Sequence, residues 1–206
     1  VKLTDKGNGK YTFKMPASKV EIEVSFTLAA NPDVNQPFVD VSPDAYYADA
    51  VAWAVENGIT NGTSDTTFSP NTGMTRGMFV TALGRLAGIN PDSYKTGKFT
   101  DVKADAYYAP YVNWAAQNGI VEGVTATTFA PDTNINREQM AVIMANYAKK
   151  LGYDLPKTLQ AVTFADNAQI SSWAKDAVKS MQQAGILVGK NGNKSVSYTH
   201  LTLPTT

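Results

Sequence analysis

The sequence predicts a mainly α-helical protein of tandem helix-loop-helix repeats, preceded by a short β segment. A block of residues recurs at a constant spacing, which indicates repeats. Apolar residues inside each block follow the period of an amphipathic helix, whereas period-two alternation is confined to the first 30 residues. The chain has 206 residues, 43% of them hydrophobic, enough for one ordinary domain or several small ones.

Residues 1–30 alternate apolar and polar side chains, as half-buried strands do. One strand is expected within 11–15 and another within 20–28, with a turn between them. Two strands alone are marginally stable in water. We therefore interpret this segment as a β-hairpin remnant of an upstream domain, and the proline- and asparagine-rich residues 31–37 as a linker.

The repeats are defined by residues that return 61 positions later. This spacing gives a first repeat at 38–90 and a second at 97–153. A third copy begins near Phe164 and stops after Gly192, which predicts a truncated repeat at 162–195. The recurring pairs include Phe38 and Phe99, Asp40 and Asp101, Trp53 and Trp114, Gly58 and Gly119, Phe68 and Phe129, and Arg76 and Arg137.

Each complete repeat is predicted to form a helix, a loop and a second helix. In the first repeat, an apolar stripe at helical spacing starts at Tyr47, and Gly58 ends the helix in a left-handed conformation. The second helix starts near Thr75 and ends at Gly88. Neither helix pair is long enough to bury a core alone, so we expect the repeats to pack on one another.

The start of each second helix carries the most chemical information. Asn136 can cap the helix of the second repeat, and a glutamine three residues later can complete a capping box. Arg137 then lies at the positive end of the helix, and Arg76 holds the same position in the first repeat. A guanidinium beside free helix N–H groups can bind an anion. Alternatively, each arginine fastens a loop by pairing with Asp65 or Asp132.

Composition limits the other function classes. Lys plus Arg and Asp plus Glu both number 18, so the zero net charge argues against nucleic acid as a partner. There is no cysteine, and the one histidine, His200, lies outside the repeats. No apolar run reaches membrane-spanning length, which argues against membrane insertion. The chain opens on Val1 rather than Met, so we interpret it as a piece of a longer protein.

We find no motif for catalysis, a metal or a cofactor. The repeats lack a convincing acid/base carboxylate pair, a Ser/His/Asp set, a glycine-rich phosphate loop and a cluster of metal ligands. Several carboxylates are more simply interpreted as solvated charges at helix ends and in loops. These are Asp44, Asp49, Asp105 and Glu122.

Taken together, the recurring motifs resemble the S-layer homology (SLH) domain of bacterial surface proteins. The matching strings of the first repeat are Phe38–Val41, Gly58–Gly62, Phe68–Pro70 and Thr75–Arg76, and each has a second-repeat equivalent. The resemblance implies a pseudo-threefold bundle of three repeats. It also implies non-covalent binding of a pyruvylated secondary polysaccharide attached to peptidoglycan, and an extracellular location at the cell wall or S-layer. The string at 11–17 similarly resembles closing strands of β repeats in large surface proteins.

The resemblance also implies ligand-binding residues. The arginines would contact the anionic sugar, the aromatic residues could stack on a sugar face or lie in the core, and the glycines would admit the ligand or form a tight turn. The aspartates match a family position, with loop fastening as the alternative. Trp53 and Trp114 are expected to pack inside helices. The proposed contacts are Arg76, Arg137, Asp40, Asp101, Asp166, Tyr46, Tyr107, Trp173, Gly62, Gly123 and Gly189.

This chain departs from the family pattern in two places. In the first repeat, Gly77 and Met78 replace the residues that would favour and cap the second helix. The third repeat lacks its arginine and its whole second helix, so it should leave apolar surface uncovered. Residues 196–206 resemble one reading frame of a sequencing adapter, and our hypothesis is that they are translated library DNA.

Three function classes follow from the sequence. The first is a module that anchors a larger secreted protein to the cell wall through its polysaccharide. The second is a structural module whose repeats mediate protein–protein contacts, including self-association in a surface lattice. The third is an enzyme, and because no catalytic constellation is found, we expect any such activity, for example of a glycoside hydrolase, to lie in another domain of the parent protein.

Overall fold

The computed structural model describes residues 4–5, 11–12, 38–189 and 192–195, within two units that divide between Pro32 and Asp33. The N-terminal unit contains two short antiparallel strands, β1 (Thr4–Asp5) and β2 (Tyr11–Thr12). The strand expected at 20–28 lies outside the described residues, as do the predicted linker and the adapter-like tail.

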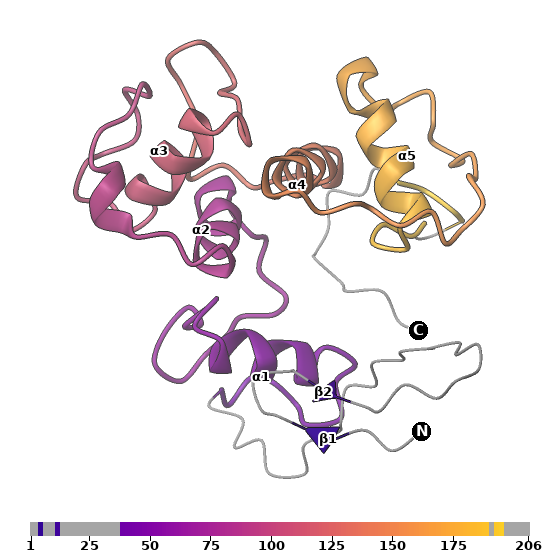
Figure 1. Ribbon diagram of the computed structural model, residues 1–206, viewed down its shortest axis with the longest axis horizontal. Coiled ribbons are helices and arrows are strands. Elements are labelled where there is room, and N and C mark those ends of the chain that lie inside the picture. Colours follow the sequence, from indigo (N-terminus) through magenta and orange to yellow (C-terminus); the bar gives the residue numbers. More distant parts are fainter. Residues whose placement is uncertain (1–3, 6–10, 13–37, 190–191, 196–206) are drawn as a thin grey trace. The chain divides into compact units, whose positions relative to one another are not determined.

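The second unit is helical, as the sequence predicts (Figure 1). The first and second repeats each contribute two α-helices, and the described part of the third contributes one. The helices are α1 (Ala48–Glu56), α2 (Arg76–Leu86), η1 (Pro91–Tyr94), α3 (Ala109–Gln117), α4 (Arg137–Leu151), η2 (Ser172–Ala174) and α5 (Lys175–Gln183).

The helix ends follow from local chemistry. The Thr75 side chain accepts a hydrogen bond from the Met78 N–H at 3.2 Å, which caps α2 although the family's acidic residue is absent. At α4 the predicted capping box is present in both directions. Gly58 and Gly152 follow α1 and α4 with φ of +68° and +74°, so both helices end in the predicted left-handed conformation.

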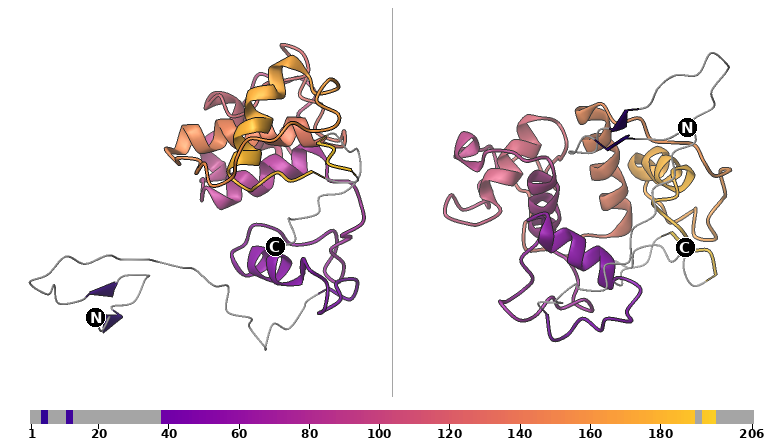
Figure 2. Two further views of the ribbon diagram at one scale, coloured as in Figure 1. Left: turned by 90° about the vertical axis from the view of Figure 1, so that its right-hand side faces the viewer. Right: turned by 60° about the horizontal axis from the view of Figure 1, so that its bottom comes forward.

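The helices that pack on one another belong to different repeats. Helix α2 of the first repeat lies against α3 of the second, and α4 of the second lies against α5 of the third (Figures 1 and 2). Within the described part of the chain, α1 has no comparable helix partner. The expectation that the repeats pack together is therefore confirmed. The second helix of each complete repeat packs on a helix of the repeat that follows it.

Each pairing encloses its own apolar core. The largest core joins α2, α3 and one face of α4 around Phe129, whose side chain is fully buried. A second core lies between α4 and α5, and the smallest belongs to the first repeat alone. A pseudo-threefold arrangement of these parts stays a prediction.

The two repeat-related tryptophans differ in their environment. Trp114 is 5% exposed and lies edge-on to Tyr147 of α4, with the ring centres 6.4 Å apart. Trp53 is 47% exposed, so the prediction that it packs inside the fold is wrong. The physical reason is that the small first-repeat core closes on the opposite side of α1, around Val51.

Candidate functional site

The predicted site aspartates fasten the loops of their own repeats. In the first repeat, Asp40 accepts backbone hydrogen bonds from Phe68 at 2.8 Å and Ser69 at 2.7 Å. Ser69 has a φ of +58°, so the carboxylate holds the loop at a left-handed residue. The alternative interpretation of Asp40 as a loop fastener therefore matches its contacts, and a sugar contact stays a prediction.

The same bonds recur in the next repeats. Asp101 accepts from the N–H groups of Phe129 at 2.9 Å and Ala130 at 2.7 Å. Asp166 accepts from the Ser195 N–H at 2.7 Å and from its hydroxyl at 3.1 Å. The third repeat thus closes its loop although the sequence motif has ended, and Ser195 takes the place that Ala130 has in the second repeat.

We expect acid to release the first of these loops. Hydrogen bonds from the backbone, that of Phe68 first, hold the pKa of Asp40 below its ordinary value against the smaller effect of burial. A lowered folded-state pKa means that the stabilisation is present above the unfolded pKa and is lost as the pH falls through the folded pKa. An NMR titration should therefore show Asp40 titrating at lower pH than an unfolded aspartate, with the Phe68 amide shifting in parallel. An ordinary Asp40 pKa would contradict this.

Arg76 crosses from the first repeat into the second. Its Nε donates to the Phe129 carbonyl at 2.9 Å and its Nη2 donates to the Glu122 carbonyl at 3.2 Å. The guanidinium carbon lies 4.5 Å from the centre of the Phe129 ring, and the residue is only 4% exposed. Burial lowers the pKa of Arg76, and the charge of Asp101 opposes that effect. Arg76 is thus a fastener between repeats.

The first N–H groups of α2 are also engaged by the second repeat. Arg76 N–H donates to the Thr133 carbonyl at 2.9 Å, and Gly77 N–H donates to the Pro131 carbonyl at 2.8 Å. A Cβ on Gly77 would lie 3.0 Å from the ring of Tyr108, so the glycine permits this close approach. The N–H groups that were predicted to be open to an anion therefore donate to a loop of the second repeat instead.

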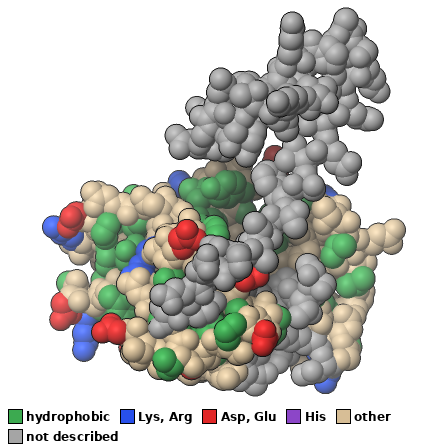
Figure 3. Space-filling view, turned by 90° about the horizontal axis from the view of Figure 1, so that it is seen from below, with side chains coloured by type: hydrophobic (Ala, Val, Ile, Leu, Met, Phe, Trp, Pro, Cys, Tyr) green, Lys and Arg blue, Asp and Glu red, His purple; other side chains and the backbone are tan. Residues whose placement is uncertain are grey.

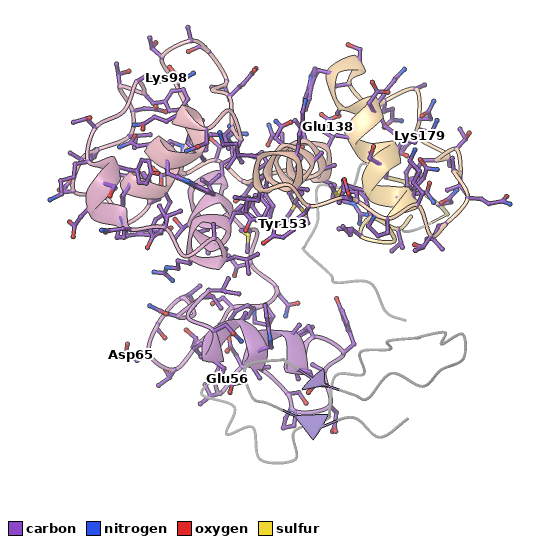
Figure 4. All side chains as sticks on the ribbon, in the orientation of Figure 1. Glu56, Asp65, Lys98, Glu138, Tyr153 and Lys179 are labelled. Carbon is purple, nitrogen blue, oxygen red and sulfur yellow. The ribbon has the colours of Figure 1, made fainter. Side chains whose placement is uncertain are left out.

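Arg137 makes the equivalent crossing from the second repeat to the third. Its Nη2 donates to the Val188 carbonyl, at the position that corresponds to Glu122. Glu138, labelled in Figure 4, reinforces the contact by accepting from Ser171 N–H at 2.9 Å and from its hydroxyl at 3.1 Å. Arg137 is half-buried, less enclosed than Arg76.

Neither arginine forms an ion pair with Asp65 or Asp132 within the described residues. The alternative in which each arginine fastens a loop by pairing with one of these aspartates is therefore wrong. Backbone carbonyls of the next repeat take the place of the carboxylates. A direct contact of Arg76 or Arg137 with a sugar stays a prediction.

The aromatic site positions lie at the surface. Tyr46, Tyr107 and Trp173 are 48%, 57% and 57% exposed. The following tyrosines, Tyr47 and Tyr108, point inward and meet the exposed rings edge-on, with ring centres 5.2 Å and 5.1 Å apart. Of the two roles that the sequence left open, a core position is therefore excluded for the three exposed rings.

The site glycines accommodate neighbouring groups of their own repeat. A Cβ on Gly62 would lie 2.4 Å from the Phe38 ring, and one on Gly123 would lie 2.6 Å from the Phe99 ring. At Gly189, a Cβ would lie 2.2 Å from the Asn193 side chain. These positions serve close packing, and ligand contact stays a prediction for them.

A cavity of about 600 Å³ lies between α1, the following loop of the first repeat and α2. Tyr46 and Tyr107 both line it, together with Arg85, which was not among the predicted site residues. The guanidinium of Arg85 lies 6.0 Å from the Tyr111 ring and donates one long hydrogen bond, 3.4 Å, to the Ile59 carbonyl. Burial raises the pKa of Tyr107, and the charge of Arg85 opposes that effect.

The repeat pattern does not single out Arg85. The position 61 residues later holds Asn146, so Arg85 is absent from the pattern that the repeats share. Hydrophobic side chains also reach the surface among charged ones on the face shown in Figure 3. The described residues contain no cluster suited to a metal ion. Among them, no helix combines the length and apolar character needed to span a bilayer.

Comparison with known proteins matches residues 37–77 and 98–141 to the S-layer homology domain. The chain is 30% identical over 161 residues to an amylopullulanase of Thermoanaerobacterium thermosulfurigenes, covering 78% of this chain and 8% of that protein. It is 36% identical over 157 residues to an endoglucanase of Bacillus sp. strain KSM-635, covering 76% and 16%. It is 28% identical over 148 residues to the surface-layer 125 kDa protein of Lysinibacillus sphaericus, covering 72% and 12%.

The chain thus spans less than a fifth of the length of these three relatives. The matched residues are those in which the loop aspartates, the crossing arginines and the exposed tyrosines recur. An S-layer homology domain is an anchoring domain of cell-surface proteins and not a catalytic one, which locates the chain at the bacterial cell wall. The chain belongs to the S-layer homology domain family through its two repeats at residues 37–77 and 98–141.

Proposed function

We propose that this chain anchors a larger secreted protein by binding, without a covalent bond, an anionic, pyruvate-bearing secondary polysaccharide of the cell wall. The observation that carries the proposal is the exposure of Tyr46, Tyr107 and Trp173 at equivalent positions in three repeats. A large aromatic side chain gains by leaving water, so three exposed rings in one repeated position favour a ligand-binding role. Flat aromatic rings suit the apolar faces of sugar rings.

The charge of the ligand is supported by Arg85. Arg85 lines the same cavity as Tyr107, and its guanidinium makes one hydrogen bond in the described part of the chain. An arginine with remaining donors can bind a carboxylate in a bidentate manner. A negatively charged sugar substituent is therefore the group that this end of the cavity would select.

Tyr107→Ala and Trp173→Ala should each weaken binding to purified cell walls about 2- to 10-fold, the range expected for loss of one aromatic contact. Arg85→Ala should weaken binding and reduce its dependence on salt. The measurement is co-sedimentation of the chain with peptidoglycan that retains or has lost its secondary polysaccharide. Val39→Ala is the control, because Val39 is 83% exposed and lies outside these positions.

Binding that survives removal of the polysaccharide would contradict the proposal. If the three variants then also behaved like Val39→Ala, the surface-lattice alternative would be favoured. Concentration-dependent self-association of the chain, measured by sedimentation velocity, would test that alternative directly.

A further inference from the structure

We propose that Asn61 is a site of spontaneous deamidation, a reaction that replaces its neutral side-chain amide by a carboxylate. The reaction is fastest at an asparagine followed by glycine, because a residue without a Cβ leaves its backbone nitrogen open to the preceding side chain. The described residues contain three such pairs, Asn57–Gly58, Asn61–Gly62 and Asn118–Gly119. Their surroundings differ in a way that singles out the second pair.

The reaction passes through a cyclic imide. The backbone nitrogen of Gly62 loses its proton to the solvent and attacks Cγ of Asn61, so that a C–N bond forms and the side-chain nitrogen leaves as ammonia. Water then opens the ring at one of its two carbonyl carbons, which yields aspartate or isoaspartate. In balance, asparagine and water give an acidic residue and ammonia, and water is the only co-reactant.

The two pairs at the ends of α1 and α3 are restrained by hydrogen bonds. Each glycine N–H donates to a carbonyl of the preceding helical turn, at 2.9 Å for Gly58 and 3.2 Å for Gly119. The side chains of Asn57 and Asn118 each donate from Nδ2 to the carbonyl of the tryptophan four residues earlier, both at 2.8 Å. The helix end must therefore open before either glycine nitrogen can attack, and opening costs free energy.

The pair Asn61–Gly62 lies in the loop after α1 and lacks these restraints. Asn61 is exposed, and its side-chain amide makes no hydrogen bond within the described residues. In the same part of the chain, the Gly62 N–H donates only to the Thr60 hydroxyl, at 3.3 Å, which is long for a hydrogen bond. Because a hydroxyl can rotate away, the nitrogen of Gly62 can be released without opening a helix.

The second repeat shows that a carboxylate is compatible with this position. Glu122 is 61 residues after Asn61, is exposed, and precedes Gly123 as Asn61 precedes Gly62. Its backbone carbonyl still accepts the hydrogen bond from Arg76. We therefore expect the aspartate product to keep the fold of the first repeat and to change its charge.

The isoaspartate product should have a larger structural effect, because it adds one carbon atom to the main chain. Gly62 has a φ of +78°, and a Cβ on it would lie 2.4 Å from the Phe38 ring and 2.5 Å from the Thr67 carbonyl oxygen. The backbone has no room for an additional atom beside these groups. Isoaspartate at position 61 should therefore displace the loop from Phe38 and lower the melting temperature of the chain.

The consequence for regulation rests on the proposed binding of an anionic polysaccharide. Asn61 lines the cavity that Arg85 also lines, and Arg85 donates to the carbonyl of Ile59, two residues before Asn61. A carboxylate at position 61 would repel an anionic sugar and compete with it for the guanidinium. Deamidation would thus weaken wall attachment slowly and irreversibly as the protein ages.

The test incubates the full chain at mildly alkaline pH, in native buffer and in concentrated urea, and follows each pair by peptide mapping with mass spectrometry. In native buffer, Asn61 should deamidate at least about 10-fold faster than Asn57 and Asn118, whose helix ends must open first. In urea, the three rates should agree within about 2-fold, because all three asparagines precede glycine and the folded structure is lost.

A rate at Asn57 or Asn118 equal to that at Asn61 in native buffer would overturn the proposal. So would the absence of product at Asn61 over the time in which the urea-unfolded chain reacts. Asn61→Gln is the matched control, since a glutamine forms the larger cyclic imide much more slowly, and it should leave the other two rates unchanged. The pairs Asn8–Gly9 and Asn191–Gly192 include residues outside the described part and do not enter the comparison.

The effect on wall attachment is measured separately, by the co-sedimentation assay. Asn61→Asp should weaken binding about 2- to 5-fold, as expected for one partly screened charge, whereas Asn61→Gln should bind as the original chain does. Equal binding of N61D and the original chain would overturn the regulatory consequence. Failure of every version to bind cell walls would instead contradict the proposed function, and the deamidation rates would still decide the chemistry.

Discussion

Arg76→Ala should lower the free energy of unfolding by about 3–4 kcal/mol, because two charge-assisted hydrogen bonds are each worth about 1.5–3 kcal/mol and one of them is made to the fully buried Phe129. The substitution removes the donors to Phe129 and Glu122 and the cation that stacks on the Phe129 ring. At 4% exposure, water cannot readily replace those contacts. Urea denaturation followed by far-UV circular dichroism measures the change.

Arg85→Ala is the matched control for this prediction, because it removes the same side chain from the same helix. Arg85 is half-buried and donates one 3.4 Å bond, so its loss should cost less than about 1 kcal/mol, the usual scale for a partly solvated charge. Arg76→Lys should not restore stability, since an ammonium cannot reproduce the planar contacts. Equal effects of R76A and R85A would contradict the fastening role.

The sequence predicted the helices and helix ends within each repeat better than it predicted the contacts between repeats. Helix starts and ends depend on local chemistry, so Thr75, Asn136 and Gly152 could be assigned their roles in advance. The crossing of Arg76 into the next repeat depends on packing between residues more than 45 positions apart. A repeat pattern shows that Arg76 and Arg137 are equivalent, but it does not show which partner they reach.

The same limit applies to burial. Trp53 and Trp114 occupy equivalent positions, and the pattern alone predicts equal environments for them. Their exposures, 47% and 5%, differ because α4 brings Tyr147 to one of them and the first-repeat core does not enclose the other. Arg85 was missed for the opposite reason, since its chemistry belongs to one repeat only and a search for shared residues passes over it.

Gly123→Ala should destabilise the second repeat by about 3 kcal/mol, at the upper end of the usual cost of overpacking. The added Cβ would lie 2.2 Å and 2.5 Å from the carbonyl oxygens of Thr125 and Thr128, and 2.6 Å from the Phe99 ring. Backbone atoms cannot turn away as a flexible side chain can. Thermal and urea unfolding of the full chain measure the effect.

Gly119→Ala is the control that separates crowding from backbone conformation. Gly119 has a φ of +68° but open space around its Cβ position, so alanine there should cost only the strain of a left-handed residue, about 1–2 kcal/mol. A larger effect at Gly119 than at Gly123 would contradict the crowding argument.

The losses of stability expected for Gly123→Ala and Arg76→Ala should also be coupled. Gly123 packs on Phe99, Phe99 packs on Phe129, and Phe129 provides both the ring and a carbonyl to Arg76. Substitutions that disturb one shared contact network are not additive. The double variant G123A/R76A should therefore lose less stability than the sum of the single losses. Strict additivity would mean that the loop and the contacts of Arg76 are energetically independent, although they share the same aromatic ring.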